Sequence, residues 1–177
     1  MNKGLCIYLT GLSGSGKTTI ANLLKTKLYK YTRQHAIILD GDEIRQTINY
    51  DLGLSKNNRS INVRKIGNIA NIITKNNGIA ICSNIAPYQN DRSYNRNLIE
   101  SNGNIYIEVF LKSTINECIK RDPKGLYKIN KNKIIESANE YEMPINNEIT
   151  INTEKFTKKE SVNTILDYIF HSKMDIF

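Results

Sequence analysis

The feature that most constrains this chain is a glycine-rich loop, GLSGSGKTT at residues 11–19, which directly follows the apolar run GLCIYLT at 4–10. Two glycines at this spacing, then lysine and threonine, between a predicted strand and a predicted helix, are typical of loops whose N–H groups surround nucleotide phosphates. The lysine lies at the β- and γ-phosphates, and the next hydroxyl ligates Mg²⁺. We therefore predict a nucleoside triphosphate site with Thr18 as metal ligand. Its expected phosphate contacts are Gly11, Ser13, Gly14, Ser15, Gly16, Lys17, Thr18 and Thr19.

Short apolar runs alternate with helical stretches along the whole chain, which is typical of a parallel sheet covered by helices. With 177 residues, of which 40% are hydrophobic, the chain is long enough to bury one compact core. We expect a single domain over 1–177 with a three-layer α/β fold, in which a mainly parallel, doubly wound sheet carries helices on both faces. The expected strands are 4–10, 35–40, 78–83, 104–111 and 148–152, and the expected helices are 17–31, 59–75, 91–101, 114–121 and 158–171.

The isoleucines of one expected helix and the cysteines within apolar runs are expected to have structural roles. The isoleucines of the helix expected at 59–75 recur at near-helical spacing and predict a buried face. The cysteines are widely spaced and odd in number, which predicts neither a disulfide framework nor a zinc site. The isoleucines are Ile61, Ile66, Ile69, Ile72 and Ile73, and the cysteines are Cys6, Cys82 and Cys118.

The chain carries a formal net charge of +8, and much of the excess lies between Lys120 and Lys133. The surrounding irregular segment, approximately 122–147, is polar and basic, which in a compact domain predicts a lid over a ligand. No pattern of a nucleic-acid-binding domain accompanies this charge, so a phosphorylated small molecule is favoured over nucleic acid as partner. No apolar run approaches the length of a membrane span. We expect no membrane partner and a cytoplasmic location.

The second expected strand ends in LDGDEIR at 39–45, which places Asp40 and Asp42 at the carboxyl edge of the sheet. Ligands bind at that edge in open α/β folds. A carboxylate beside the γ-phosphate can remove the proton of an acceptor hydroxyl and orient its oxygen. We predict Asp42 as the base, Asp40 as a group that orients it or a Mg²⁺-bound water, and Arg45 as an anion contact. A plain Asp-Gly turn and helix cap is the alternative for this segment.

Proteins with such a phosphate loop are mainly switches, motors and small-molecule kinases. The sequence contains no N/T-K-x-D guanine motif, and DPKG at 122–125 follows a predicted helix where a switch needs a strand. A motor ATPase needs an acidic residue at the end of the third strand, and GIAICS at 78–83 has none. The pattern therefore favours a phosphotransferase.

A set of further motifs, in the same order along nearly the whole chain, resembles the adenylylsulfate kinase (APS kinase) family. After GLSGSGKTT and LDGDEIR come LGLSKNNRSINVRKIG at 52–67, GIAICSNIAPY at 78–88, IEVFLKSTINECIKRDPKGLY at 107–127 and YEMP at 141–144. The resemblance implies transfer of the γ-phosphate of ATP, with Mg²⁺, to the 3′-hydroxyl of adenosine 5′-phosphosulfate (APS), giving PAPS. It also implies a homodimer and the P-loop kinase fold.

The similarity to the family implies roles for specific side chains. Lys17 acts at the phosphates and Asp42 serves the 3′-hydroxyl, while Arg121 and Lys124 of the expected lid approach ATP, Lys124 also reaching the acceptor. Ala86 stands where many members have serine and has no hydroxyl, so the expected mechanism is direct in-line transfer. The residues implied in acceptor binding are Asp42, Arg45, Leu54, Arg59, Asn62, Ile85, Ala86, Lys124 and Ile134.

Two positions depart from the family at the acceptor's base. Leu54 and Ile134 stand where members commonly have the phenylalanines that stack on adenine, and such stacking is worth about 1–3 kcal/mol per base in nucleic-acid binders. A kinase of the same family that acts on another nucleoside 5′-diphosphate analogue, such as cytidine diphosphoramidate, is therefore one alternative. A nucleotide-binding sensor without catalysis is the other.

Overall fold

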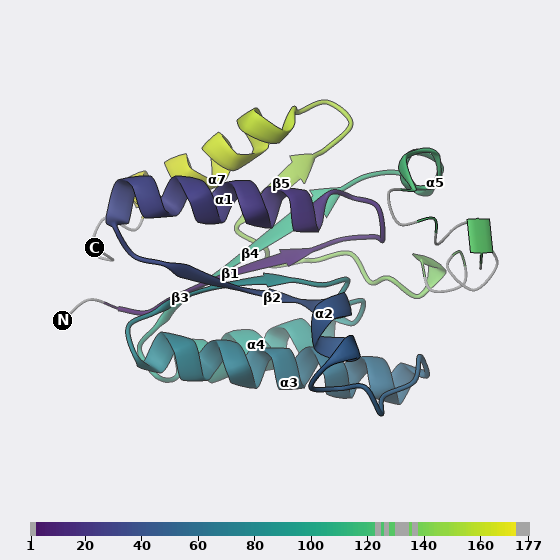
Figure 1. Cartoon of the computed structure of the whole chain (residues 1–177), viewed down its shortest axis with the longest axis horizontal. Helices are drawn as coiled ribbons and strands as arrows, with labels where there is room; N and C mark the ends of the chain where they lie inside the picture. The colour runs from purple at the N-terminus through teal and green to yellow at the C-terminus, as the bar shows by residue number, and fades with distance from the viewer. Residues whose placement is uncertain (1–2, 123–124, 126–127, 130–134, 136–137, 173–177) are drawn as a thin grey trace.

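The computed structural model describes residues 3–122, 125, 128–129, 135 and 138–172. Within this part of the chain, five parallel strands form one sheet in the order β2-β3-β1-β4-β5 (Figure 1). Each predicted strand is found within one residue of its expected ends, and the predicted parallel α/β architecture is confirmed. The strands are β1 (Leu5–Thr10), β2 (Ala36–Asp40), β3 (Ile79–Ser83), β4 (Ile105–Lys112) and β5 (Ile149–Asn152).

Helices cover both faces of the sheet, as the doubly wound pattern predicts. α1 (Lys17–Thr32) and α7 (Lys158–Ser172) lie on one face, and α3 (Lys56–Lys75) and α4 (Gln89–Glu100) lie on the other (Figure 1). Two shorter helices, α2 (Gly41–Gln46) and α5 (Ile115–Arg121), stand beyond the carboxyl ends of the strands. No helix in the described ranges is both long and apolar enough to cross a membrane.

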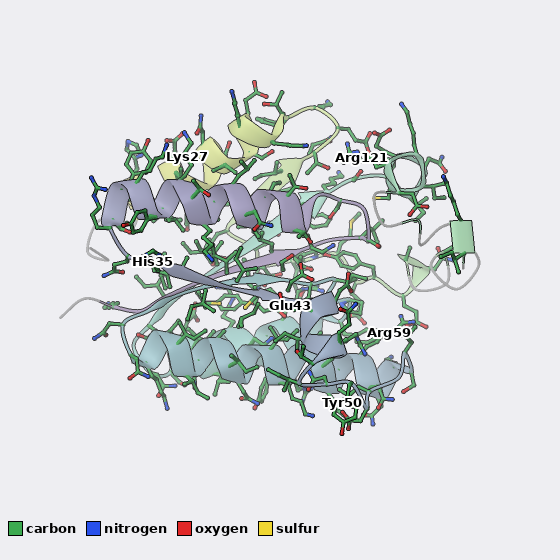
Figure 2. All side chains as sticks on the ribbon, in the orientation of Figure 1. Lys27, His35, Glu43, Tyr50, Arg59 and Arg121 are labelled. Carbon is green, nitrogen blue, oxygen red and sulfur yellow. The ribbon has the colours of Figure 1, made fainter. Side chains whose placement is uncertain are left out.

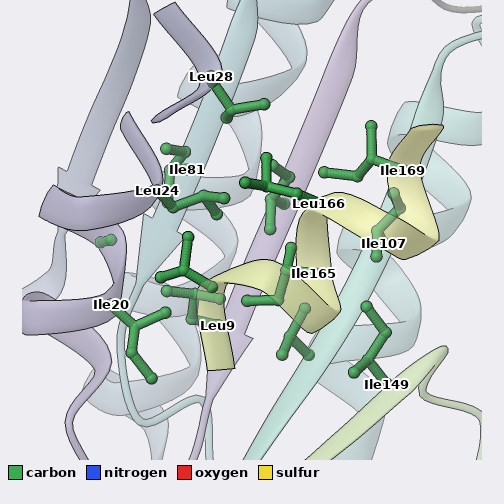
Figure 3. Close-up of a cluster of buried hydrophobic side chains, with 14 of the residues drawn as sticks. Leu9, Ile20, Leu24, Leu28, Ile81, Ile107, Ile149, Ile165, Leu166 and Ile169 are labelled. Carbon is green, nitrogen blue, oxygen red and sulfur yellow. The ribbon is translucent and has the colours of Figure 1, made fainter. Parts of the chain in front are cut away.

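The two faces of the sheet have separate hydrophobic cores, because side chains alternate along each strand. On one face, the side chains of Leu5, Ile7 and Leu9 in β1 pack with α1 and α7. Figure 3 shows this cluster, which includes Ile20 of α1 and Ile169 of α7. Cys6 and Tyr8 of the same strand face α3 and α4. All three cysteines are buried and free of disulfides, which agrees with the structural role expected of Cys6 and Cys82.

The isoleucine face of α3 is narrower than the sequence predicts. Ile66 is fully buried, and Ile69 and Ile73 pack partly against the second core. Ile72, in contrast, is 63% exposed, so its expected burial is wrong. At about 100° per residue, position 72 lies far around the helix from position 66, whereas 69 and 73 fall near it.

The starts of α3 and α4 differ most from the sequence-based expectation, and α4 begins at Gln89, two residues before its expected start. α3 begins at Lys56, three residues before its expected start, because the Ser55 hydroxyl accepts a hydrogen bond from the Asn58 N–H and caps the helix. α2 corresponds to the segment expected to carry the base, with an Asp-Gly turn and helix cap as the alternative, and the helix cap is observed. This segment is a helix whose N-cap is Asp40, which accepts from the Asp42 N–H at 3.0 Å.

The close packing of α3 on α4 depends on Gly67. A Cβ at this position would overlap the side-chain amide of Asn95, which is buried and donates to the Val63 carbonyl and the Tyr8 hydroxyl. We predict that Gly67→Ala lowers the free energy of unfolding by about 1–3 kcal/mol, since overpacking of a core costs about that much. Asn68→Ala, at the exposed neighbouring position of α3, is the matched control. Equal denaturant midpoints for the two variants would contradict the packing.

Candidate active site

The phosphate loop between β1 and α1 folds tightly around the side chain of Lys17. The Lys17 Nζ donates to the carbonyl oxygens of Gly11 (2.9 Å) and Leu12 (2.8 Å). Gly14 has φ +82°, and a Cβ there would lie 3.0 Å from the Cys118 carbonyl of α5, so both its conformation and its surroundings require glycine. The loop therefore presents the N-terminus of a 16-residue helix, where N–H groups and the helix dipole favour a phosphate.

The carboxylate of Asp40 joins three elements at the carboxyl edge of the sheet. Its Oδ2 accepts from the Thr18 hydroxyl at 2.8 Å and from the Ser83 hydroxyl at 3.2 Å, while its Oδ1 accepts from the Asp42 N–H. β2 and β3 pair in a register that sets Asp40 opposite Ser83. The predicted metal ligand, Thr18, is thus linked through one carboxylate to the residue predicted as base. Ser83 was missed, although a hydroxyl at the last position of a buried strand was its signal.

The oxygen atoms around Asp40 are of the kind that Mg²⁺ prefers. Mg²⁺ in kinases is held by one or two protein oxygens together with substrate phosphates. The Thr18 hydroxyl and the Asp40 carboxylate lie at the helix end where the phosphates are expected, so these residues fit the ion. The described residues contain no group of three or more His, Cys, Asp or Glu side chains that could hold a metal by themselves.

Asp42 lies in the first turn of α2 and is exposed. Gly41 lets this turn approach the end of β3, because a Cβ on Gly41 would lie 2.7 Å from the Cβ of Asn84. Asn84 is itself fixed by the Tyr8 hydroxyl, which donates to its Oδ1 at 3.0 Å. In the Asp40-Gly41-Asp42 sequence, packing therefore requires the glycine, and the two aspartates supply the polar groups.

Arg59 lies close enough to Arg45 to affect the pKa of the Arg45 guanidinium. Burial lowers the pKa of Arg45, the Arg59 guanidinium lowers it further, and Asp42 opposes the change. Arg45 Nη1 donates to the carbonyl oxygens of Leu52 (3.2 Å) and Gly53 (3.0 Å). Arg59 Nε donates to the Leu54 carbonyl at 2.8 Å. The two arginines thus hold the segment before α3, and Arg45 lies near enough to Asp42 for the two charges to interact.

The other residues predicted to bind the acceptor differ in their exposure to solvent, and two of them lie outside the described residues. Leu54 is 64% exposed, and its carbonyl accepts from Arg59 Nε. Asn62 is only 4% exposed, and its Oδ1 accepts from the buried Asn49 Nδ2 at 2.9 Å. The structure therefore gives Asn62 a buried contact between α3 and the segment that follows α2. Ile134 and Lys124 lie outside the described residues, as does much of the lid expected at 122–147.

A buried arginine holds the wall formed by residues 85–88. Arg92 is fully buried and donates to the carbonyl oxygens of Ala86 (2.6 Å) and Glu142 (2.7 Å). It also pairs with Glu108 at 3.1 Å, where burial raises the pKa of the carboxyl and Arg92 opposes the rise. Ala86 has φ +45°, a conformation that costs a non-glycine residue about 1–2 kcal/mol. Sequence reasoning missed Arg92, because only the fold brings its partners together.

Arg121 lies at the end of α5, on the same side of the molecule as Arg59 (Figure 2). Its guanidinium donates to Glu117 Oε1 (3.0 Å), the Thr153 hydroxyl (3.0 Å) and the Thr153 carbonyl (2.8 Å). These contacts fix α5 to the end of β5. Tyr50, by contrast, lies at the outer surface beyond α3 (Figure 2) and is 80% exposed.

Comparison with known proteins places this geometry in a family. The family model described as adenylylsulphate kinase matches residues 3–152. The chain belongs to the adenylylsulphate kinase family. It is 40% identical to an adenylyl-sulfate kinase of Staphylococcus epidermidis over 172 residues, which are 95% of this chain and 85% of the relative.

Solved structures of the family agree with the fold. The APS kinase of Mycobacterium tuberculosis in complex with AMPPNP and APS superposes with a TM-score of 0.87 at 29% identity, covering 96% of this chain and 99% of that one. A hexameric APS kinase from Thiobacillus denitrificans gives a TM-score of 0.76 at 34% identity, covering 97% of this chain and 29% of that one. The resemblance drawn from the sequence motifs is confirmed.

One contact in this adenylylsulphate kinase links the acceptor side to Glu140, a described residue within the segment expected as the lid. The Tyr88 hydroxyl donates to Glu140 Oε2 at 2.6 Å, and Arg59 Nη1 lies 3.3 Å from the same oxygen. Tyr88 is 6% exposed. Burial and the hydrogen bond to Glu140 raise the pKa of Tyr88 to about 12.

This raised pKa has a predicted consequence at high pH. The native chain holds the Tyr88 proton more tightly than the unfolded chain, whose tyrosines ionise near 10. Stability that Tyr88 contributes below pH ~10 is therefore lost as the pH rises through about 12. We expect the difference between the ultraviolet absorbance titrations of the native protein and of Tyr88→Phe to show one phenol with a midpoint near 12. A midpoint at the ordinary tyrosine value would contradict the contact with Glu140.

Proposed function

We propose that this chain is an adenylyl-sulfate kinase that transfers the γ-phosphate of ATP to the 3′-hydroxyl of adenosine 5′-phosphosulfate, giving PAPS. The observation that carries the proposal is the carboxylate of Asp40, which bonds both the Thr18 hydroxyl and the Asp42 N–H. A phosphate donor at the loop and an acceptor hydroxyl at Asp42 would then be adjacent.

On the donor side, the phosphate loop holds the ATP phosphates. Its backbone N–H groups surround the phosphates, and Lys17 supplies a positive charge at the β- and γ-phosphates. The family motif assigns Arg121 and Lys124 to ATP as well. The Thr18 hydroxyl and the Asp40 carboxylate would hold Mg²⁺. When bound, Mg²⁺ neutralises charge on the phosphate oxygens.

On the acceptor side, Asp42 accepts the proton of the 3′-hydroxyl and directs its oxygen toward the γ-phosphorus. Arg45 and Arg59 face the negatively charged phosphosulfate, for which fixed guanidinium groups are well suited. The wall at Ile85 and Ala86, held by Arg92, completes the pocket. Because Ala86 offers no hydroxyl, the phosphoryl group passes directly from ATP to the acceptor.

Leu54 is the residue that supports a second candidate substrate. Its exposed apolar side chain packs against a base less specifically than a stacked aromatic ring does. A smaller pyrimidine, as in cytidine diphosphoramidate, depends less on such stacking. We also retain in the proposal a homodimer, which the family resemblance implies, and the single domain and cytoplasmic location expected from the sequence.

An ATP-consumption assay over a panel of acceptors tests the proposal. We expect turnover with APS and production of PAPS, and little turnover with cytidine diphosphoramidate or simple nucleotides. Turnover of the cytidine compound with APS ignored would replace the substrate but keep the reaction. Turnover of no acceptor, with ATP still bound, would support the sensor alternative.

The role of Asp42 has its own test. We predict that Asp42→Asn keeps ATP binding, measured by calorimetry, and lowers kcat by about 100-fold or more, since general-base catalysis contributes at least that factor. Glu43→Gln removes the neighbouring, exposed carboxylate of α2 and is the matched control, with kcat expected to stay near that of the native protein. An unchanged kcat in Asp42→Asn would remove Asp42 from the role of base.

A further inference from the structure

Glu140 lies between two residues of the acceptor side and is not part of any motif that the proposed reaction uses. Its Oε2 accepts a short hydrogen bond from the Tyr88 hydroxyl (2.6 Å) and a longer one from Arg59 Nη1 (3.3 Å). The Glu140 side chain is 48% exposed, whereas that of Arg59 is 17% exposed. A solvent-accessible carboxylate therefore contacts a largely enclosed guanidinium.

The surroundings of this carboxylate are positively charged. The charge of Arg59 lowers the pKa of nearby Arg45. The Lys56 Nζ lies 5.0 Å from the centre of the Tyr88 ring. Arg59 is also the side chain that, in the proposed function, faces the phosphosulfate of the acceptor. Glu140 thus places a negative charge where the negatively charged end of the acceptor is expected.

We propose that Glu140 is an internal competitor of the acceptor's oxyanion for Arg59, and that it thereby sets the acceptor's KM. The inference rests on the proposed function, because it needs an anionic acceptor at Arg59. It assigns a specificity-determining role to a residue outside the phosphate loop and outside the LDGDEIR segment.

The two hydrogen bonds of Glu140 explain how it can yield to the acceptor. The contact with Arg59 is through one oxygen and one guanidinium nitrogen at 3.3 Å, so it lacks the bidentate geometry of strong arginine pairs. The 2.6 Å bond from Tyr88 involves a different donor and survives when Arg59 turns to another anion. The carboxylate can therefore lose Arg59 and remain hydrogen-bonded.

The opposite role for Glu140 makes the opposite prediction. If the carboxylate oriented Arg59 for the acceptor, its removal would weaken acceptor binding. If it competes with the acceptor, its removal strengthens binding. A half-exposed ion pair is worth little, so the expected effect is about 3- to 5-fold in KM.

Steady-state kinetics of Glu140→Gln with APS, at saturating Mg-ATP, tests the inference. Glutamine keeps an acceptor oxygen for Tyr88 and removes the charge. We expect the KM for APS to fall about 3- to 5-fold, with kcat and the KM for ATP within about 2-fold of the native values. Glu140→Ala, checked by thermal melting, is the second variant and is expected to change the KM in the same direction.

Glu142→Gln is the matched control, because it removes the same charge two residues along the chain. Glu142 Oε2 accepts from the Gln89 N–H, and its backbone N–H donates to the Pro87 carbonyl. We expect its KM for APS to stay within about 2-fold of the native value, because this carboxylate makes a different contact.

A double-variant cycle separates contact from distant repulsion. In an Arg59→Gln background, Glu140→Gln is expected to leave the KM for APS unchanged, because the competed group is gone. An unchanged or raised KM in Glu140→Gln alone, or a full effect that persists without Arg59, would overturn the inference. A native protein that ignores APS would instead overturn the proposed function, so the two failures are distinguishable.

Discussion

The hydrogen bonds of the Asp40 carboxylate are the interactions on which the rest of the site depends. Its two oxygens reach the Thr18 hydroxyl, the Ser83 hydroxyl and the Asp42 N–H, and so connect α1, β3 and α2. The parallel register of β2 and β3 makes this possible, because it brings the ends of both strands to the same level. One carboxylate thereby fixes the spacing between the phosphate loop and the proposed base.

A second set of interactions, made by Arg92, holds the wall formed by residues 85–88 in place. Arg92, buried within α4, holds the strained backbone of Ala86 and the carbonyl of Glu142 at the same time. Removing one partner of a buried pair such as Arg92 and Glu108 is costly, because the other charge is left unpaired in the interior. The wall is therefore held by buried contacts where it meets the sheet, while Glu140 and Leu54 are exposed to solvent.

Local patterns were sufficient to predict the strands, the phosphate loop and the position of Asp40 and Asp42. These features depend on neighbours in sequence: an apolar run, glycines at fixed spacing, and polar residues at a strand end. The signals that failed were also local. Ser55 was not recognised as the cap of α3, and Ile72 was counted with the buried face although its angle around the helix points it to solvent.

The contacts that sequence reasoning missed join residues far apart in the chain. Arg92 meets Glu142 across 50 positions, and Arg59 meets Glu140 across 81, so no spacing rule connects them. Asn62 was assigned to the acceptor by its motif, and only the fold places Asn49 against it. Contacts of this kind follow from the fold and cannot be read from composition or periodicity.

The central claim is that the phosphoryl group passes directly from the loop to a hydroxyl beside Asp42. The stereochemical course at phosphorus tests it most directly, with ATP whose γ-phosphorus has been made chiral by oxygen isotopes. A single in-line displacement predicts inversion of configuration in the 3′-phosphate of PAPS. Retention would require a phosphorylated enzyme intermediate and would contradict the account.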